Sequence, residues 1–139
     1  RAGTENTILA VGLGKACEIS IEALKSNKVK ELTEYFYSNL KDNFKDKLQL
    51  NGHPEIRLPN TLNVSFLGYD GHEILSLLEG TAASTGSACH SGITQISPVL
   101  KAMGASEEAG RGAVRFSLGR YTTKEEIDTV ISKLKQIIN

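Results

Sequence analysis

The segment AVRFSLGRYTTKEEID, residues 113–128, decides the fold. Its first six residues alternate as a half-buried strand does, which places Arg115 and Ser117 on one face and the apolar side chains on the other. A helix begins directly afterwards, because Thr123 and, three residues later, Glu126 have the spacing of a capping box. A strand that runs into a capped helix predicts a sheet with helices packed on it.

Apolar periodicity predicts two long helices upstream, from Thr7 to Leu24 and from about Val29 to Asp46, which resemble a helical hairpin. Turn and capping residues predict the other elements: a strand over 62–67, a short helix over 72–79, a brief strand over 81–83, short helices over 97–104 and 106–111, a strand over 113–118 and a final helix from Thr123. The order predicts an α/β or α+β sandwich whose small sheet is covered mainly on one face.

Composition excludes several classes of protein. The 139 residues suit one domain, and 16 basic residues balance 16 acidic ones, so no net field attracts nucleic acid or a membrane surface. The apolar stretches are too short to span a bilayer, and we expect a soluble, cytoplasmic protein. Two cysteines are too few for a disulfide framework or a four-ligand zinc site, so no metal site is predicted. The chain opens on Arg1, and we expect it to be part of a longer protein.

The stretch STGSACHSG, residues 84–92, places Cys89 among small polar residues and glycines. Glycines permit unusual backbone angles, and function gathers on loops, so Cys89 is a candidate nucleophile. The alternative, a packed and inert cysteine, stays open at this point. His90 follows it directly, but adjacent side chains on an extended loop point apart, so we treat His90 as a modulator at best. For Cys17, inside the first predicted helix, we expect core packing.

Arg115 lies inside an otherwise apolar strand. Its planar guanidinium matches a carboxylate, so an anion is one explanation for its place there, and a solvated strand face or a structural salt bridge is the other. At the start of the chain, Thr4 and Asn6 are ordinary residues for capping the first helix. The segment GLGKA, residues 12–16, lacks the spacing of a phosphate-binding loop.

Taken together, RAGTENT near the start, LPNTLNVSF, GSACHSG and VRFSLGRYTTKEEID resemble the C-terminal part of the cysteine desulfurases and selenocysteine lyases. These enzymes belong to the class V aminotransferase group of pyridoxal-phosphate enzymes. The ordered set covers almost the whole chain. The resemblance implies the small domain of a fold-type I enzyme, 1–139, without the large domain that carries the cofactor lysine.

The resemblance also implies roles for single residues. Cys89 corresponds to the loop cysteine that takes sulfur or selenium from the substrate, and Arg115 to the arginine that binds the substrate carboxylate. Thr4 corresponds to a threonine that reaches the cofactor phosphate of the neighbouring subunit in a homodimer. L-cysteine or L-selenocysteine is then the substrate, pyridoxal 5'-phosphate the cofactor of the complete enzyme, and an iron–sulfur scaffold a candidate sulfur acceptor.

Two features leave alternatives open. No segment here resembles the family's histidine and lysine that hold the cofactor, so we expect the isolated chain to be inactive. A non-enzymatic persulfide carrier and a dimerisation module are therefore rival interpretations. His90 stands where many bacterial desulfurases have threonine, which leaves the choice between sulfur and selenium open.

Overall fold

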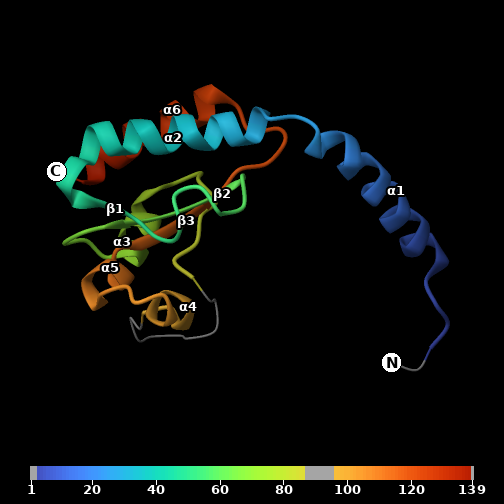
Figure 1. Ribbon diagram of the computed structural model, residues 1–139, viewed down its shortest axis with the longest axis horizontal. Helices are drawn as coiled ribbons and strands as arrows, with labels where there is room; N and C mark the ends of the chain where they lie inside the picture. The colour runs from blue at the N-terminus through green and yellow to red at the C-terminus, as the bar shows by residue number, and fades with distance from the viewer. Residues whose placement is uncertain (1–2, 87–95, 139) are drawn as a thin grey trace.

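The computed structural model describes residues 3–86 and 96–138. Its elements, in chain order, are α1 (Thr7–Leu24), α2 (Lys28–Phe44), the 3-10 turn η1 (Lys45–Lys47), β1 (Leu48–Leu50), β2 (Thr61–Phe66), α3 (Gly71–Leu77), α4 (Pro98–Ala102), α5 (Glu107–Arg111), β3 (Ala113–Ser117) and α6 (Lys124–Ile137). Figure 1 shows α2 and α6 side by side above the strands and α4 and α5 below them, while α3 contacts both β3 and α6. The predicted mixture of helices with one small sheet is confirmed.

The sheet has three strands in the order β1-β2-β3, and both pairings are antiparallel. Between β2 and β3, Val64 lies opposite Val114 and Asn63 lies opposite Arg115. Successive side chains of a strand point to opposite faces, so this register gives the sheet one apolar face and one polar face. The alternation predicted for residues 113–118 is confirmed, because Arg115 is exposed while its strand neighbours Val114 and Phe116 are buried.

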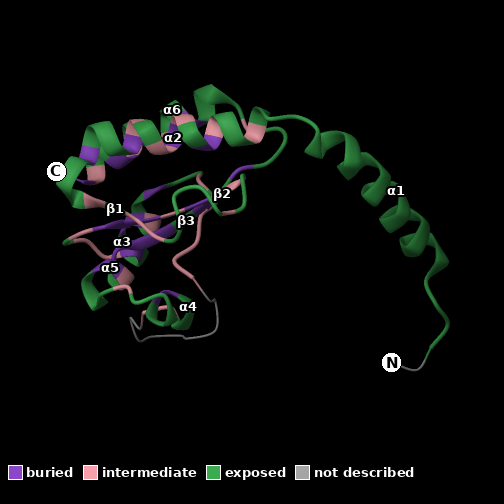
Figure 2. Cartoon of the chain, in the orientation of Figure 1, coloured by how far each residue is buried: buried purple, intermediate pink, exposed green. Residues whose placement is uncertain are grey.

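The core lies between the apolar face of the sheet and the two long helices α2 and α6. Phe36 of α2 packs edge-on against Phe116, with ring centroids 5.0 Å apart, and Phe44 does the same with Phe66 at 5.5 Å. Figure 2 shows the buried residues concentrated on the strands and on the inner sides of these helices. Each fully buried side chain of this size contributes about 1.5–3 kcal/mol, so this layer dominates the stability of the domain.

Helix starts are fixed by side-chain caps. The predicted capping box of α6 is confirmed: Thr123 Oγ1 accepts from the backbone N–H of Glu126 at 3.2 Å, and Glu126 Oε2 accepts from the N–H of Thr123 at 2.9 Å. Caps of this kind contribute about 1 kcal/mol each.

A side-chain hydrogen bond also joins the two long helices of the core. The Tyr35 hydroxyl of α2 donates to Asp128 of α6 at 2.6 Å, and this hydrogen bond raises the pKa of Tyr35.

The first helix corrects two predictions. Its bounds match those predicted, but α1 does not fold back on α2, and Figure 1 shows it standing away from the body of the protein. Every residue of α1 is exposed (Figure 2), and nothing lies within 4 Å of a Cβ built on Gly12 or Gly14. The helical hairpin was therefore wrong, and so was core packing of Cys17, which is exposed.

Two smaller differences concern the strands. The brief strand expected over 81–83 is absent, and only Ser84 forms an isolated bridge, with Arg115. Strand β1 was not predicted from the sequence, although it pairs with β2 over its full length. Among the described helices, none has both the length and the apolar character needed to cross a membrane.

Gly112, directly before β3, gives a test of this packing. A Cβ on Gly112 would lie 2.1 Å from the backbone oxygen of Phe66, although the Gly112 φ of −82° suits any residue. We expect Gly112→Ala to lower the free energy of unfolding by about 1–3 kcal/mol, measured by urea denaturation, because the clash has no room to relax. Gly119→Ala is the matched control, since nothing lies within 4 Å there. Equal stabilities for the two variants would contradict the close approach of residue 112 to β2.

Candidate functional site

A pocket of about 450 Å³ opens on the polar face of the sheet. This volume lies within the range of small-molecule sites, about 300–1,000 Å³. The residues that line it come from β2 and β3, from the segments after β1 and after Ser84, and from α4 with its two caps: Asn51, Asn63, Thr85, Gly86, Ser97, Pro98, Val99, Leu100, Met103 and Arg115. Arg115 is the charged residue of this set, and no acid is among them, so the described lining favours an anion.

Backbone pairing on both sides holds Arg115 in place. On one side it lies opposite Asn63 of β2, and on the other its N–H donates to the carbonyl of Ser84 at 2.6 Å, while the Ser84 N–H donates back at 3.1 Å. Its side chain is exposed and forms no ion pair or hydrogen bond with the described residues. The structural salt bridge considered from the sequence is therefore not formed with the described residues.

Next to Arg115, three polar side chains form a hydrogen-bonded chain across the same face. Asn51 Nδ2 donates to Asn63 Oδ1 at 2.9 Å and to Ser65 Oγ at 2.7 Å. Ser65 is buried, and its hydroxyl donates to the backbone carbonyl of Ala109 at 2.5 Å. Asn51 and Asn63 line the pocket with Arg115, so this part of the pocket wall is polar and hydrogen-bonded.

The predicted nucleophile and its neighbour lie outside the described residues. Cys89 and His90 belong to residues 87–95, so their predicted roles stay predictions. The described residues on either side of that segment are informative, because Gly86 and Ser97 both line the Arg115 pocket. Gly86 has a φ of +132°, which is favourable for glycine alone, and its N–H donates to Ser84 Oγ at 3.2 Å.

The start of the chain is far from this pocket along the fold. Asn6 caps α1, its Oδ1 accepting from the N–H of Leu9 at 3.0 Å, as the sequence indicated. Thr4 is exposed and takes no part in that cap. The structure does not bring Thr4 and Arg115 together, and Figure 1 shows the N-terminal end of α1 well away from the sheet.

The described residues do not fit a complete cofactor site. Pyridoxal phosphate is held in its enzymes by a lysine Schiff base, and no lysine lines the Arg115 pocket. Among the described lysines only Lys133 is partly buried, and its Nζ donates to the backbone carbonyl of Glu79. The described part of the chain also holds no group of three or more His, Cys, Asp or Glu side chains placed to bind a metal ion.

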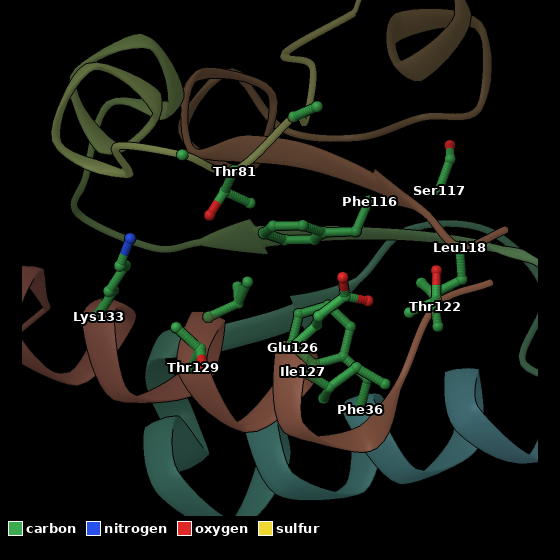
Figure 3. Close-up of a pocket in the computed structure, with 13 residues that line it drawn as sticks. Phe36, Thr81, Phe116, Ser117, Leu118, Thr122, Glu126, Ile127, Thr129 and Lys133 are labelled. Atoms are coloured by element: carbon green, nitrogen blue, oxygen red, sulfur yellow. The ribbon is translucent and has the colours of Figure 1, made fainter.

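A second pocket, of about 390 Å³, lies between β3 and α6 and is shown in Figure 3. Phe36 and Phe116 form part of its wall, and Lys133 extends from α6 toward the segment that carries Thr81. Its charged groups already have structural partners: Lys133 binds a backbone carbonyl, and Glu126 completes the capping box of α6. The Arg115 pocket is therefore the better candidate for chemistry.

The chain is similar to curated proteins that are cysteine desulfurases. The chain is 42% identical over 151 residues to cysteine desulfurase NifS of Azotobacter vinelandii and covers 35% of that protein. It is 41% identical over 142 residues to cysteine desulfurase IscS of Dictyoglomus turgidum and covers 36% of it, and 36% identical to the human cysteine desulfurase, of which it covers 30%. Each alignment includes at least 98% of this chain, which thus spans about a third of the length of these relatives.

Solved structures give the same result. A NifS-like protein matches with a TM-score of 0.83 at 33% identity, over 99% of this chain and 35% of that one. A NifS-like protein from Rickettsia africae matches with the same TM-score at 26% identity and 36% coverage. The family model described as aminotransferase class-V matches residues 1–130. On this evidence the chain belongs to the class V aminotransferase family, among relatives that are cysteine desulfurases.

Proposed function

We propose that residues 1–139 form the C-terminal small domain of a pyridoxal-phosphate-dependent cysteine desulfurase, which removes sulfur from L-cysteine and yields L-alanine. In this proposal Arg115 binds the substrate carboxylate and Cys89 receives the sulfur as a persulfide. The observation that carries it is the guanidinium of Arg115, which has no ion-pair or hydrogen-bond partner among the described residues and lies in a pocket whose wall includes residues on both sides of the Cys89 segment. L-selenocysteine is the alternative substrate, because Arg115 would bind its carboxylate equally well.

The role of Arg115 follows from its surroundings. An arginine fork binds a carboxylate with two parallel hydrogen bonds, and the described pocket contains no acid that would compete. Its place on β3, paired with Asn63 and bridged to Ser84, fixes the backbone from which the side chain extends. A clamp on a rigid strand suits a reaction that needs the substrate held in one orientation.

The role of Cys89 is supported by covalent geometry. Three peptide units separate Cys89 from Gly86, which limits the distance between their Cα atoms to about 11 Å. Gly86 lines the Arg115 pocket, so the length of the intervening chain permits the thiol to reach a substrate bound there. A thiolate near its substrate is the usual arrangement for nucleophilic transfer of sulfur.

Two observations support the proposed domain boundary: the exposed apolar surface of α1, and a described pocket lining that contains no lysine for the cofactor. Seven large apolar side chains of α1 are exposed: Ile8, Leu9, Val11, Leu13, Ile19, Ile21 and Leu24. A helix that is apolar on most of its surface is usually buried in its complete protein. We propose that the remainder of the enzyme covers α1 and supplies the cofactor lysine, and that Thr4 reaches the cofactor phosphate across a homodimer. An iron–sulfur scaffold remains the proposed sulfur acceptor.

In the full-length enzyme, Arg115→Ala should raise KM for L-cysteine while kcat changes little. A hydrogen-bonded charge pair contributes about 1.5–3 kcal/mol, which corresponds to roughly a 10- to 150-fold rise in KM. Steady-state alanine formation measures both constants, and Arg111→Ala, an exposed arginine outside the pocket, is the control. An unaltered KM for Arg115→Ala would contradict the clamp.

Cys89→Ser in the full-length enzyme should lower the rate of sulfide release from saturating L-cysteine by at least about 100-fold, because the hydroxyl is a far weaker nucleophile. The visible absorbance of the bound cofactor should not change. Cys17→Ser controls for general loss of a thiol, since Cys17 lies on α1 outside the Arg115 pocket. Sulfide release at the parental rate from Cys89→Ser would remove Cys89 from the mechanism.

The isolated chain should not bind the cofactor covalently. When pyridoxal phosphate is added in equimolar amount, we expect no visible absorbance band of a lysine-bound cofactor, because no lysine lines the Arg115 pocket. Borohydride reduction followed by mass measurement gives a second readout, with the full-length enzyme as the positive control. Stoichiometric labelling of one lysine in the isolated chain would contradict the proposed domain boundary.

A further inference from the structure

We infer that Asn63 is a second binding group for the substrate carboxylate and that Asn51 and Ser65 fix the direction of its amide. This inference rests on the proposed role of Arg115. The Asn63 amide would be a neutral hydrogen-bond donor beside the Arg115 guanidinium. This role explains why hydrogen-bonded polar side chains, and not apolar ones, lie next to the pocket.

The direction of the amide follows from one end of the hydrogen-bonded chain. The carbonyl of Ala109 only accepts, so the Ser65 hydroxyl must donate its single proton there. Ser65 Oγ can then only accept, which requires Asn51 to present its NH₂ group to it. The second proton of that NH₂ group goes to Asn63, which must therefore present its oxygen. The donor end of Asn63, Nδ2, is left without an acceptor among the described residues.

The position of Asn63 matches that of Arg115. The two residues lie directly opposite each other on neighbouring strands, on the same face of the sheet, and both line the pocket. Opposite residues have Cβ atoms about 4.5–5.5 Å apart, so one small anion can contact both side chains. A carboxylate has two oxygens with several lone pairs, and it can accept from the guanidinium and from an amide N–H together.

The burial of Ser65 makes this arrangement costly to disturb. Ser65 is fully buried, so removing its hydroxyl leaves the Ala109 carbonyl and one Asn51 proton without their partners. The Asn51 amide would then no longer be fixed and could turn its oxygen toward Asn63, so that Asn63 would donate to Asn51 and present its own oxygen to the pocket, where it would repel a carboxylate. Asn51 and Ser65 are in this sense positioning residues, and Asn63 is the residue that touches the ligand.

Asn63→Asp in the full-length enzyme tests the inference. The aspartate keeps an oxygen for Asn51 but replaces the donor by a negative charge beside the substrate carboxylate. KM for L-cysteine should rise by about 10- to 100-fold with kcat little changed. Asn43→Asp, an exposed residue of α2 outside the pocket, adds the same charge as a matched control and should leave KM unchanged. An unaltered KM for Asn63→Asp would overturn the inference.

A second measurement needs neither turnover nor a variant at position 63. In ¹⁵N-labelled chain of 139 residues titrated with L-alanine as the carboxylate probe, the side-chain resonances of Asn63 and Arg115 should shift together. Methylamine, which has no carboxylate, should move neither. The Ser65→Ala chain should keep the Arg115 shift and lose most of the Asn63 shift. If only the Arg115 resonance shifted in the parent chain, the role of Asn63 would be overturned. If neither resonance shifted, both the role of Asn63 and the proposed binding of the carboxylate by Arg115 would be refuted.

Discussion

Between β2 and β3, Val64 faces Val114 and Asn63 faces Arg115, and both the core and the site depend on this register. Because side chains alternate along a strand, a slip of one residue would turn Arg115 toward α2 and α6 and bring Val114 to the solvent side. The edge-on contact between Phe36 and Phe116 would be lost with it. The same apolar packing that stabilises the domain therefore places the arginine in its pocket.

Most of the fold could be predicted from local patterns, and the failures have physical causes. The capping box at Thr123 and the alternation around Arg115 are properties of neighbouring residues, so the sequence carried them fully. Strand β1 is three residues long, too short for a pattern, and it exists because it pairs with β2. Helix α1 was predicted with the correct bounds, but its predicted packing against α2 was wrong, because apolar periodicity shows that a helix has an apolar face and not which element covers that face.

The site was predicted in the same uneven way. Arg115 could be found because a cation inside an apolar strand is unusual, whereas Asn51 and Asn63 are common polar residues that no sequence pattern marks as part of a site. Alternation alone would have placed Asn63 and Ser65 on the polar face of the sheet. Their hydrogen bonds to Asn51, 12 and 14 residues away in sequence, depend on the pairing of β1 with β2, which no local pattern predicts.

The composition of the described pocket supports the proposed division of labour within the enzyme. Its described lining combines one cation with neutral donors and lacks both a lysine and an acid, which suits recognition of an anion and supplies no group for a Schiff base. A small domain can bind a carboxylate with one strand and a buried chain of hydrogen-bonded side chains, because each binding side chain needs only a neighbouring group that holds it in position. Covalent chemistry on an amino acid needs an electron sink that side chains do not provide. The proposed division between a domain that binds the substrate and a remainder that holds the cofactor follows from that difference.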